Sequence, residues 1–311
     1  MDLSEQIKNY YFDRIGELPQ DKRFHYASRL AAWEGEPRAY RLLRALRGYI
    51  IPSDKTLEAA IDELLRQQPH KGINSYEARK PLFEKYPDLY GIHSALFRVR
   101  HLRAIYGVDA LPILLNLAGK QRLDELADQL IADEQALKTL STYAVNFLYL
   151  YKVVLLGQDD YIDLKSIIEL KAGYDLSDPK QIQLLIYLYT HCVIGASNFY
   201  TRKLSAAQRG DYVSMVRILE PLIKERFDDI NLDNKLEFLV CARICEAETE
   251  LFEKIYQECA QSLSPNGDFL VDRHNKNAQA DRVTLDRSEH RNVLFIMSCS
   301  PYNPRSALAQ D

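Results

Sequence analysis

Apolar residues recur at steps of three and four along most of this chain of 311 residues, which is the spacing of one face of an α-helix. Glycine and proline fall almost wholly between the periodic segments, and no segment shows the alternation of a β-strand. The pattern therefore predicts an all-α protein. The predicted helices cover residues 4–15, 21–33, 37–51, 56–68, 75–86, 89–106, 110–118, 122–133, 135–156, 161–172, 181–202, 206–226, 233–262 with a break, and 288–298.

The most apolar of these helices recur at a nearly constant distance. Their centres are 50, 53, 45, 50 and 49 residues apart, and they lie near Leu43, His93, Asn146, His191, Cys241 and His290. A more polar, amphipathic helix lies between each pair, as in a repeat of helical hairpins. We expect six hairpins that close into an (α/α)6 toroid, a single domain over residues 1–311, with an open α-solenoid as the alternative.

One turn near the end of the chain carries a family resemblance. Gln261, Gly267 and Phe269 resemble the glutamine, glycine and aromatic residue of a turn in terpenoid-cyclase-like (α/α)6 toroids. That family usually has tryptophan at the position of Phe269. The segments YLYTHCVIGASNFYTR and DFLVDRHN also look similar to bacterial helical proteins with no assigned activity. The resemblance covers the final third of the chain and implies a toroid, but it implies no particular chemistry.

The predicted helix at residues 181–202 is apolar on nearly every side, which is typical of a helix that neighbours bury all round. One narrow stripe of this helix is nevertheless polar, because steps of four and three residues return to the same helical face. The stripe consists of Tyr187, His191, Gly195, Asn198 and Arg202. Such a stripe either is satisfied by hydrogen bonds inside the protein or faces a wet cavity. For His191 alone, a core histidine bonded to a neighbour is the ordinary explanation.

Other helices of the apolar set, which we expect to lie on the inside of the toroid, carry comparable polar groups. If these helices converge, the groups line one central cavity, where His93, Asn146, His191 and His290 approach one another. The complete set of candidate cavity residues is His93, Arg100, Asn146, Tyr187, His191, Asn198, His290 and Arg291.

A stretch without helical periodicity, residues 268–287, interrupts the otherwise regular pattern. Long irregular loops in compact domains are often functional. Its polar residues predict either a lid over the cavity or a plain surface loop, and the lid candidates are Asp272, Arg273, His274 and Asn275.

Two motifs raise the question of a metal ion. Cys241 and Cys245 share a helical face and could bind a thiophilic metal, but two thiolates need further ligands, and buried thiols are the interpretation we favour. The string from Asp159 to Asp163 matches the DDxxD pattern that binds magnesium in terpenoid synthases. It precedes a predicted helix, however, where aspartates act as caps. We therefore predict no metal and no cofactor.

Charge and composition limit the kinds of binding partner and the location that we expect for this protein. A net charge of −4 argues against binding to nucleic acid or to an anionic membrane, and no apolar run has the length of a membrane span. The start lacks the features of a secretory signal, and five cysteines in apolar runs are typical of reduced thiols, so we expect a cytoplasmic protein. The oligomeric state is open.

Strong catalytic motifs do not occur in the sequence. We therefore expect a binding or scaffold module that holds a small molecule or peptide in the cavity. The alternative is a toroid enzyme (a hydrolase, lyase or cyclase) in which His191 or His290 acts as a general acid or base.

Overall fold

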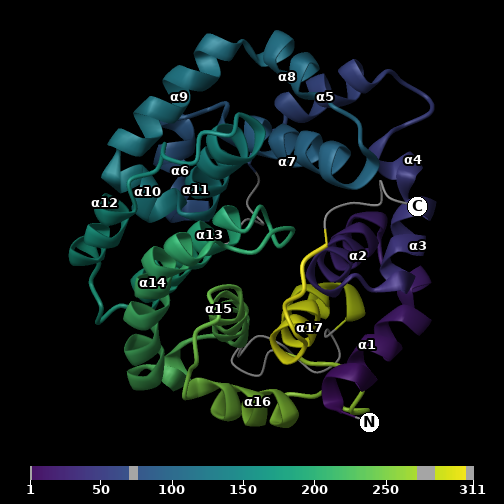
Figure 1. Ribbon diagram of the computed structural model, residues 1–311, viewed down its shortest axis with the longest axis vertical. Helices are drawn as coiled ribbons and strands as arrows, with labels where there is room; N and C mark the ends of the chain where they lie inside the picture. Colours follow the sequence, from purple (N-terminus) through teal and green to yellow (C-terminus); the bar gives the residue numbers. More distant parts are fainter. Residues whose placement is uncertain (1, 70–75, 272–283, 306–311) are drawn as a thin grey trace. The chain divides into compact units, whose positions relative to one another are not determined.

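The computed structural model describes residues 2–69, 76–271 and 284–305, which form 17 α-helices and no β-strand (Figure 1). This confirms the prediction of an all-α protein. The chain divides into two compact units, here called unit 1 (Met1–Leu46 and Tyr200–Arg305) and unit 2 (Arg47–Phe199, with residues 306–311 outside the described part). Each unit is described by itself.

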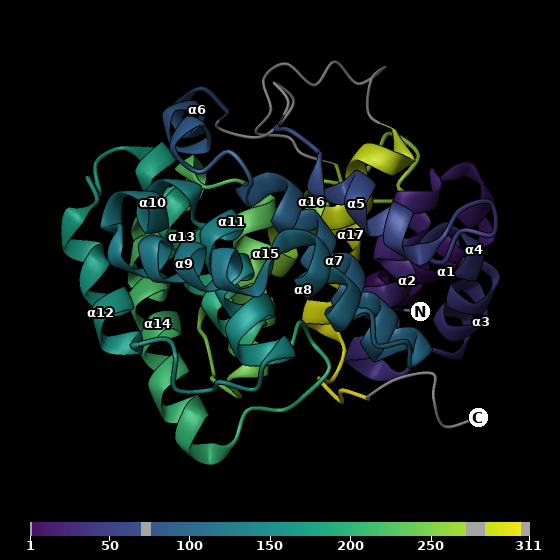
Figure 2. The same cartoon turned by 90° about the horizontal axis from the view of Figure 1, so that it is seen from above.

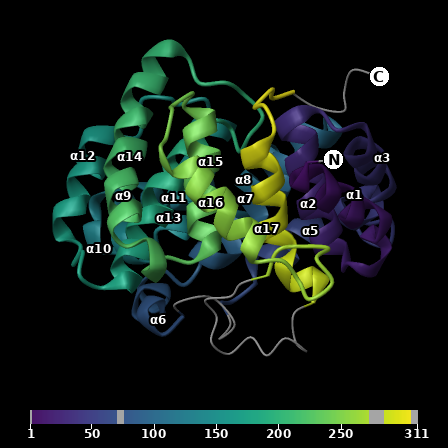
Figure 3. The same ribbon diagram turned by 90° about the horizontal axis from the view of Figure 1, so that it is seen from below.

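Unit 1 combines the first helices of the chain with the last ones. Helix α17 packs against α1, α2 and α15, and Figure 3 shows α15 and α17 side by side. The core includes Trp33, Phe238 and Phe295, whose side chains are almost completely buried. The helices of this unit are α1 (Leu3–Asp13), α2 (Gln20–Glu34), α3 (Pro37–Ala45), α14 (Ala206–Glu225), α15 (Leu232–Ile244), α16 (Leu251–Gln261) and α17 (Leu285–Cys299).

Unit 2 is built from the middle of the chain. Among its most buried helices, α11 packs against both α7 and α13, and α10 lies against α11 and α13 (Figure 2). The helices of this unit are α4 (Arg47–Ile50), α5 (Leu57–Leu65), α6 (Tyr76–Lys85), α7 (Leu89–Tyr106), α8 (Leu111–Ala118), α9 (Lys120–Ala132), α10 (Glu134–Leu140), α11 (Thr142–Leu148), α12 (Leu164–Glu169) and α13 (Pro179–Ala196). A π-helical segment, η2 (Tyr149–Leu155), continues α11.

Local sequence explains where α13 begins. The side chain of Asp178 accepts a hydrogen bond from the backbone N–H of Lys180, and Pro179 occupies the first turn, where it leaves no backbone donor unsatisfied. The helix ends at Ala196, six residues before the predicted end. Asn198, Phe199 and Tyr200 have φ between 50° and 75°, a left-handed conformation that no α-helix continues.

Two other predicted helices are interrupted in the same way. Ser141, with φ of 37°, separates α10 from α11 inside the predicted helix at residues 135–156. Glu246, with φ of 52°, lies in the segment that separates α15 from α16, which is the break expected in residues 233–262. Neither left-handed residue is a glycine, so only the tertiary structure reveals these positions.

The turn that carries the family resemblance is compact. The backbone N–H of Ser264 donates to the carbonyl of Phe269, and Leu263 and Leu270 form an isolated antiparallel bridge. Gly267 has φ of 78°, which a glycine adopts without strain. Phe269 stacks on Tyr10 at 5.9 Å, so the turn is fastened to α1.

None of the helices in the described ranges is long and apolar enough to cross a membrane.

Candidate functional site

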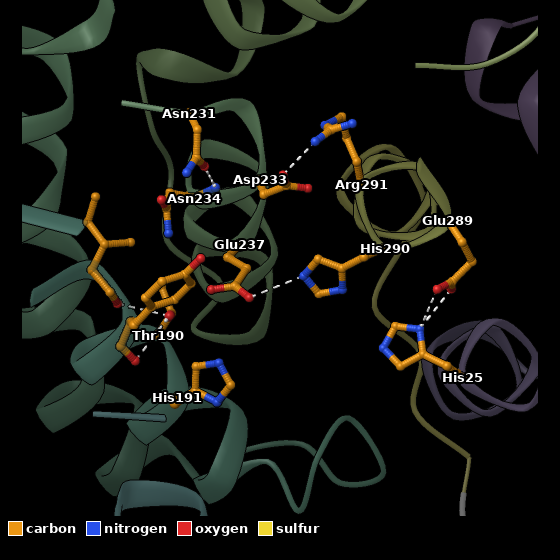
Figure 4. A network of polar contacts seen from close by, with 12 residues as sticks. His25, Thr190, His191, Asn231, Asp233, Asn234, Glu237, Glu289, His290 and Arg291 are labelled. Atoms are coloured by element: carbon orange, nitrogen blue, oxygen red, sulfur yellow. Dashed lines mark hydrogen bonds and ion pairs between the residues drawn. The ribbon is translucent and has the colours of Figure 1, made fainter. Parts of the chain in front are cut away.

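The first turns of α17 direct two adjacent side chains to different neighbours. Consecutive helical residues are about 100° apart around the axis, because a turn holds about 3.6 residues. Glu289 therefore meets α2, whereas His290 meets α15, and both lie within unit 1 (Figure 4).

The carboxylate of Glu289 contacts one ring nitrogen of His25 on α2. His25 Nδ1 lies 2.7 Å from Oε1 and 2.9 Å from Oε2 of Glu289, so a proton on Nδ1 is donated to the carboxylate. The Glu289 side chain is completely buried, whereas the His25 side chain is 33 % exposed. Among the described residues, no group is hydrogen-bonded to the other nitrogen, Nε2. The carboxylate thus leaves the Nε2 lone pair of His25 available to a substrate.

His290 and Glu237 of α15 form a second, longer pair. His290 Nε2 lies 3.5 Å from Oε1 of Glu237, whose side chain is 4 % exposed, and the imidazole is 34 % exposed. Within the described ranges, Nδ1 of His290 has no hydrogen-bond partner. Each histidine therefore directs one nitrogen to a buried carboxylate and keeps the other available.

The two imidazoles are neighbours. Their ring centroids are 5.5 Å apart, and the ring planes are tilted by 41°. Removal of the ring from water lowers the pKa of His290 to about 3, and burial with the charge of Arg29 lowers the pKa of His25. Burial raises the pKa of Glu289. Both imidazoles are therefore neutral near pH 7, which is the form that accepts a proton.

Basic side chains surround this pair of histidines. Lys22 Nζ lies 3.7 Å from Oε2 of Glu289, and Arg29 acts electrostatically on both imidazoles. Arg291 donates to Asp233 at 2.7 Å, so this candidate cavity residue is bound to an acidic partner on α15 (Figure 4).

Sequence reasoning found His290 and Arg291 but missed His25, Glu237 and Glu289. One signal was present: Lys22, His25 and Arg29 recur at steps of three and four on a helix that is otherwise rich in buried apolar residues. Such a basic stripe requires an acidic or wet neighbour. Only the tertiary structure shows that the neighbour is Glu289, 264 positions away.

Unit 2 contains the other candidate cavity residues. His191 Nδ1 lies 2.8 Å from Oδ1 of Asn146, and the ring of Tyr187 packs edge-on against His191. His93 lies against the ring of Tyr143, one turn before Asn146 on α11, and its buried Nε2 has no hydrogen-bond partner in the described chain. Burial lowers the pKa of His93 to about 4. The structure thus joins Asn146 with His191; a cavity shared by all four predicted residues stays a prediction.

Arg100 contacts the backbone of Asn198, and this contact has a structural role. The Arg100 side chain is buried, and its Nη2 donates to the backbone carbonyls of Asn198 and Phe199 at 2.7 and 3.0 Å. These carbonyls belong to the left-handed segment that ends α13. Arg100 therefore stabilises this helix end.

Two further groups of candidates are the predicted lid and the DDxxD string. Asp272, Arg273, His274 and Asn275, the lid candidates, lie outside the described residues. Asp163 of the DDxxD string caps α12 by accepting from the backbone N–H of Lys165, as the cap interpretation predicted.

Thiols and metal ligands give no further site. Burial raises the pKa of Cys192, Cys245 and Cys299 to about 12, so these thiols are poor nucleophiles at neutral pH. Cys241 is buried like Cys245. In the part of the chain that the structure describes, no group of three or more histidine, cysteine, aspartate and glutamate side chains is placed to hold a metal ion.

Unit 1 also contains a cavity of about 640 Å³. The C-terminal half of α15 and the segment after it line this cavity. None of the four residues of the two histidine–carboxylate pairs is part of its lining. Its lining residues are Leu239, Ala242, Arg243, Glu246, Ala247, Glu248, Thr249, Phe252, Pro301 and Tyr302.

No family model, curated protein or solved structure matches this chain.

Proposed function

We propose that unit 1 is an acid–base catalyst that takes a proton from a small polar substrate, with His25 and His290 as the proton-handling residues. One observation carries this proposal: two partly exposed imidazoles lie 5.5 Å apart, and each has one nitrogen directed to a buried carboxylate. A buried carboxylate that orients an imidazole is the arrangement of a general base and its positioning residue.

The contacts of each residue indicate its role in proton transfer. His25 Nε2 accepts the proton, and the imidazolium that forms is stabilised by Glu289 at 2.7 Å. His290 faces the same substrate from α17, while Glu237 orients its ring. Proton abstraction of this kind serves lyases, isomerases and hydrolases that activate water.

A general probe of proton abstraction tests this proposal. 5-Nitrobenzisoxazole loses its C3 proton to a base, the N–O bond breaks, and a coloured cyanophenolate forms. A lowered pKa makes each imidazole a weaker base than free imidazole, but a substrate bound beside the two rings gains more from proximity, so we expect the protein to accelerate this reaction beyond free imidazole at the same concentration. His25→Gln and His290→Gln should each lower the rate by about a hundredfold or more.

A matched control uses a histidine away from the two pairs. His101 lies on α7 in unit 2, and His101→Gln should keep the rate of the unchanged protein. Circular dichroism shows whether each variant is folded. A wild-type rate no greater than that of free imidazole, or equal rates for all three variants, would contradict the proposal.

A second candidate is a binding module for a small molecule or peptide, as the sequence favoured. The observation that supports it is the cavity of about 640 Å³ in unit 1, because ligand pockets commonly occupy a few hundred to about a thousand Å³. A thermal-shift screen discriminates the two: a ligand whose stabilising effect is lost in Phe252→Ala but kept in His25→Gln favours the binding module.

We also propose that the helical hairpins close into an (α/α)6 toroid. The recurrence of apolar helices about every 50 residues supports a ring, and small-angle scattering would separate it from the longer open solenoid. The buried cysteines, none of which forms a disulfide in the described ranges, support a cytoplasmic location.

A further inference from the structure

Arg29 lies on the same face of α2 as His25 and Lys22. The residues are separated by four and three positions, and residues so spaced are neighbours on the helix surface. This face packs against α17, where Glu289 contacts both His25 and Lys22. Arg29 therefore extends the row of side chains that forms the proposed catalytic site.

The guanidinium of Arg29 is held in place but not satisfied. Its central carbon lies 5.4 Å above the ring of Tyr200, a buried side chain, in a cation–π contact. Its Nη1 atom is buried and has no hydrogen-bond partner among the residues that the structure describes. A buried guanidinium N–H without an acceptor is unfavourable, and such groups frequently mark a function.

The carboxylate on which Arg29 acts electrostatically is bonded to other side chains. Glu289 is bound to His25 and also pairs with Lys22 at 3.7 Å. Glu289 thus has partners of its own, whereas Arg29 has the ring of Tyr200. No described residue accepts a hydrogen bond from Nη1.

We propose that Arg29 binds an oxyanion of the substrate, a carboxylate or a phosphate, while His25 and His290 handle the proton; this inference rests on the acid–base function proposed above. Arginine suits the role because its planar fork matches both kinds of oxyanion, and its charge-assisted hydrogen bonds are strong. Anchoring the anion on α2 one turn from His25 would place the rest of a small substrate beside the two imidazoles.

Acetate serves as the probe for a carboxylate, and inorganic phosphate serves as the probe for a phosphate. Calorimetry measures their affinity, and the ring signals of His25 and His290 in NMR spectra report where they bind. We expect saturable binding of at least one probe, with shifts of both ring signals. In Arg29→Gln the affinity should fall about tenfold or more, and Arg29→Lys, which keeps the charge over Tyr200, should retain part of it.

Arg38 provides a matched control. Its guanidinium also lies over an aromatic ring, Phe12 at 4.2 Å, but it donates to Glu36 and Asn9 and so is satisfied. Arg38→Gln should therefore leave anion affinity unchanged. Equal affinities of the unchanged protein and Arg29→Gln, or no binding of either probe, would overturn the inference.

The two proposals fail in distinguishable ways. If the histidine variants lose proton abstraction while Arg29→Gln keeps anion affinity, only the inference about Arg29 is wrong. If Arg29→Gln loses anion affinity while the unchanged protein shows no proton abstraction, Arg29 is an anion site and the catalytic proposal is wrong.

Discussion

Acidification offers a direct test of the environment assigned to His290. Its pKa is lowered to about 3, from an ordinary value of about 6.5, because the ring is removed from water. The side chain is 34 % exposed, so solvent screening limits how much of this change contributes to the free energy of unfolding. One pKa unit corresponds to about 1.4 kcal/mol, and we expect a contribution of at least this size.

The lowered pKa makes the stability of the fold depend on pH. Between the native pKa and about 6.5, the unfolded chain binds more protons at His290 than the native protein does. The free energy of unfolding contributed by this group is therefore complete above about pH 6.5 and decreases as the pH falls towards the native pKa. His25 acts in the same direction, because its pKa is also lowered.

Glu289 contributes with the opposite sign. Burial raises its pKa above the ordinary value, so its contribution is complete at low pH and is lost as the pH rises through the raised pKa. Glu289→Gln removes this opposing group. We expect the stability of this variant to decrease more steeply on acidification than that of the unchanged protein.

The assay is an NMR titration of the histidine ring signals, with His290→Gln identifying the signal of His290. Urea unfolding at several pH values provides the corresponding free energies. A titration midpoint of His290 at about 6.5, the value of an exposed histidine, would refute the reasoning. The same conclusion would follow if His290→Gln left the pH dependence of stability unchanged.

Three substitutions test other parts of the structure by urea unfolding. His191→Leu leaves the buried Asn146 without its 2.8 Å contact and should lower the free energy of unfolding by about 1–3 kcal/mol; no loss would indicate a side chain facing water. Gly195→Ala would place a Cβ 2.7 Å from Cβ of Tyr149 and should cost about 1–3 kcal/mol through overpacking, and a neutral effect would contradict this packing. Asp163→Ala removes the cap of α12 and should lower the free energy of unfolding, whereas Asp163→Asn should lower it less; equal effects would argue against the cap.

The sequence by itself determined the fold class and most helix positions. Apolar spacing at three and four residues requires burial of one helical face, and local signals such as Asp178 with Pro179 act on the residues beside them. These causes are contained within a dozen neighbouring residues, so a sequence displays them. The cap at Asp163 was predictable for the same reason.

The tertiary structure alone decided the left-handed residues that end helices and the composition of the site. Ser141 and Tyr200 adopt positive φ although neither is a glycine, because packing overrides the backbone preference. His25 meets Glu289 across 264 positions, and no spacing rule connects residues so far apart in the chain. His290 was recognised as a candidate, but its partner Glu237 and its lowered pKa follow from burial and from helix packing, which exist only once α2, α15 and α17 have come together.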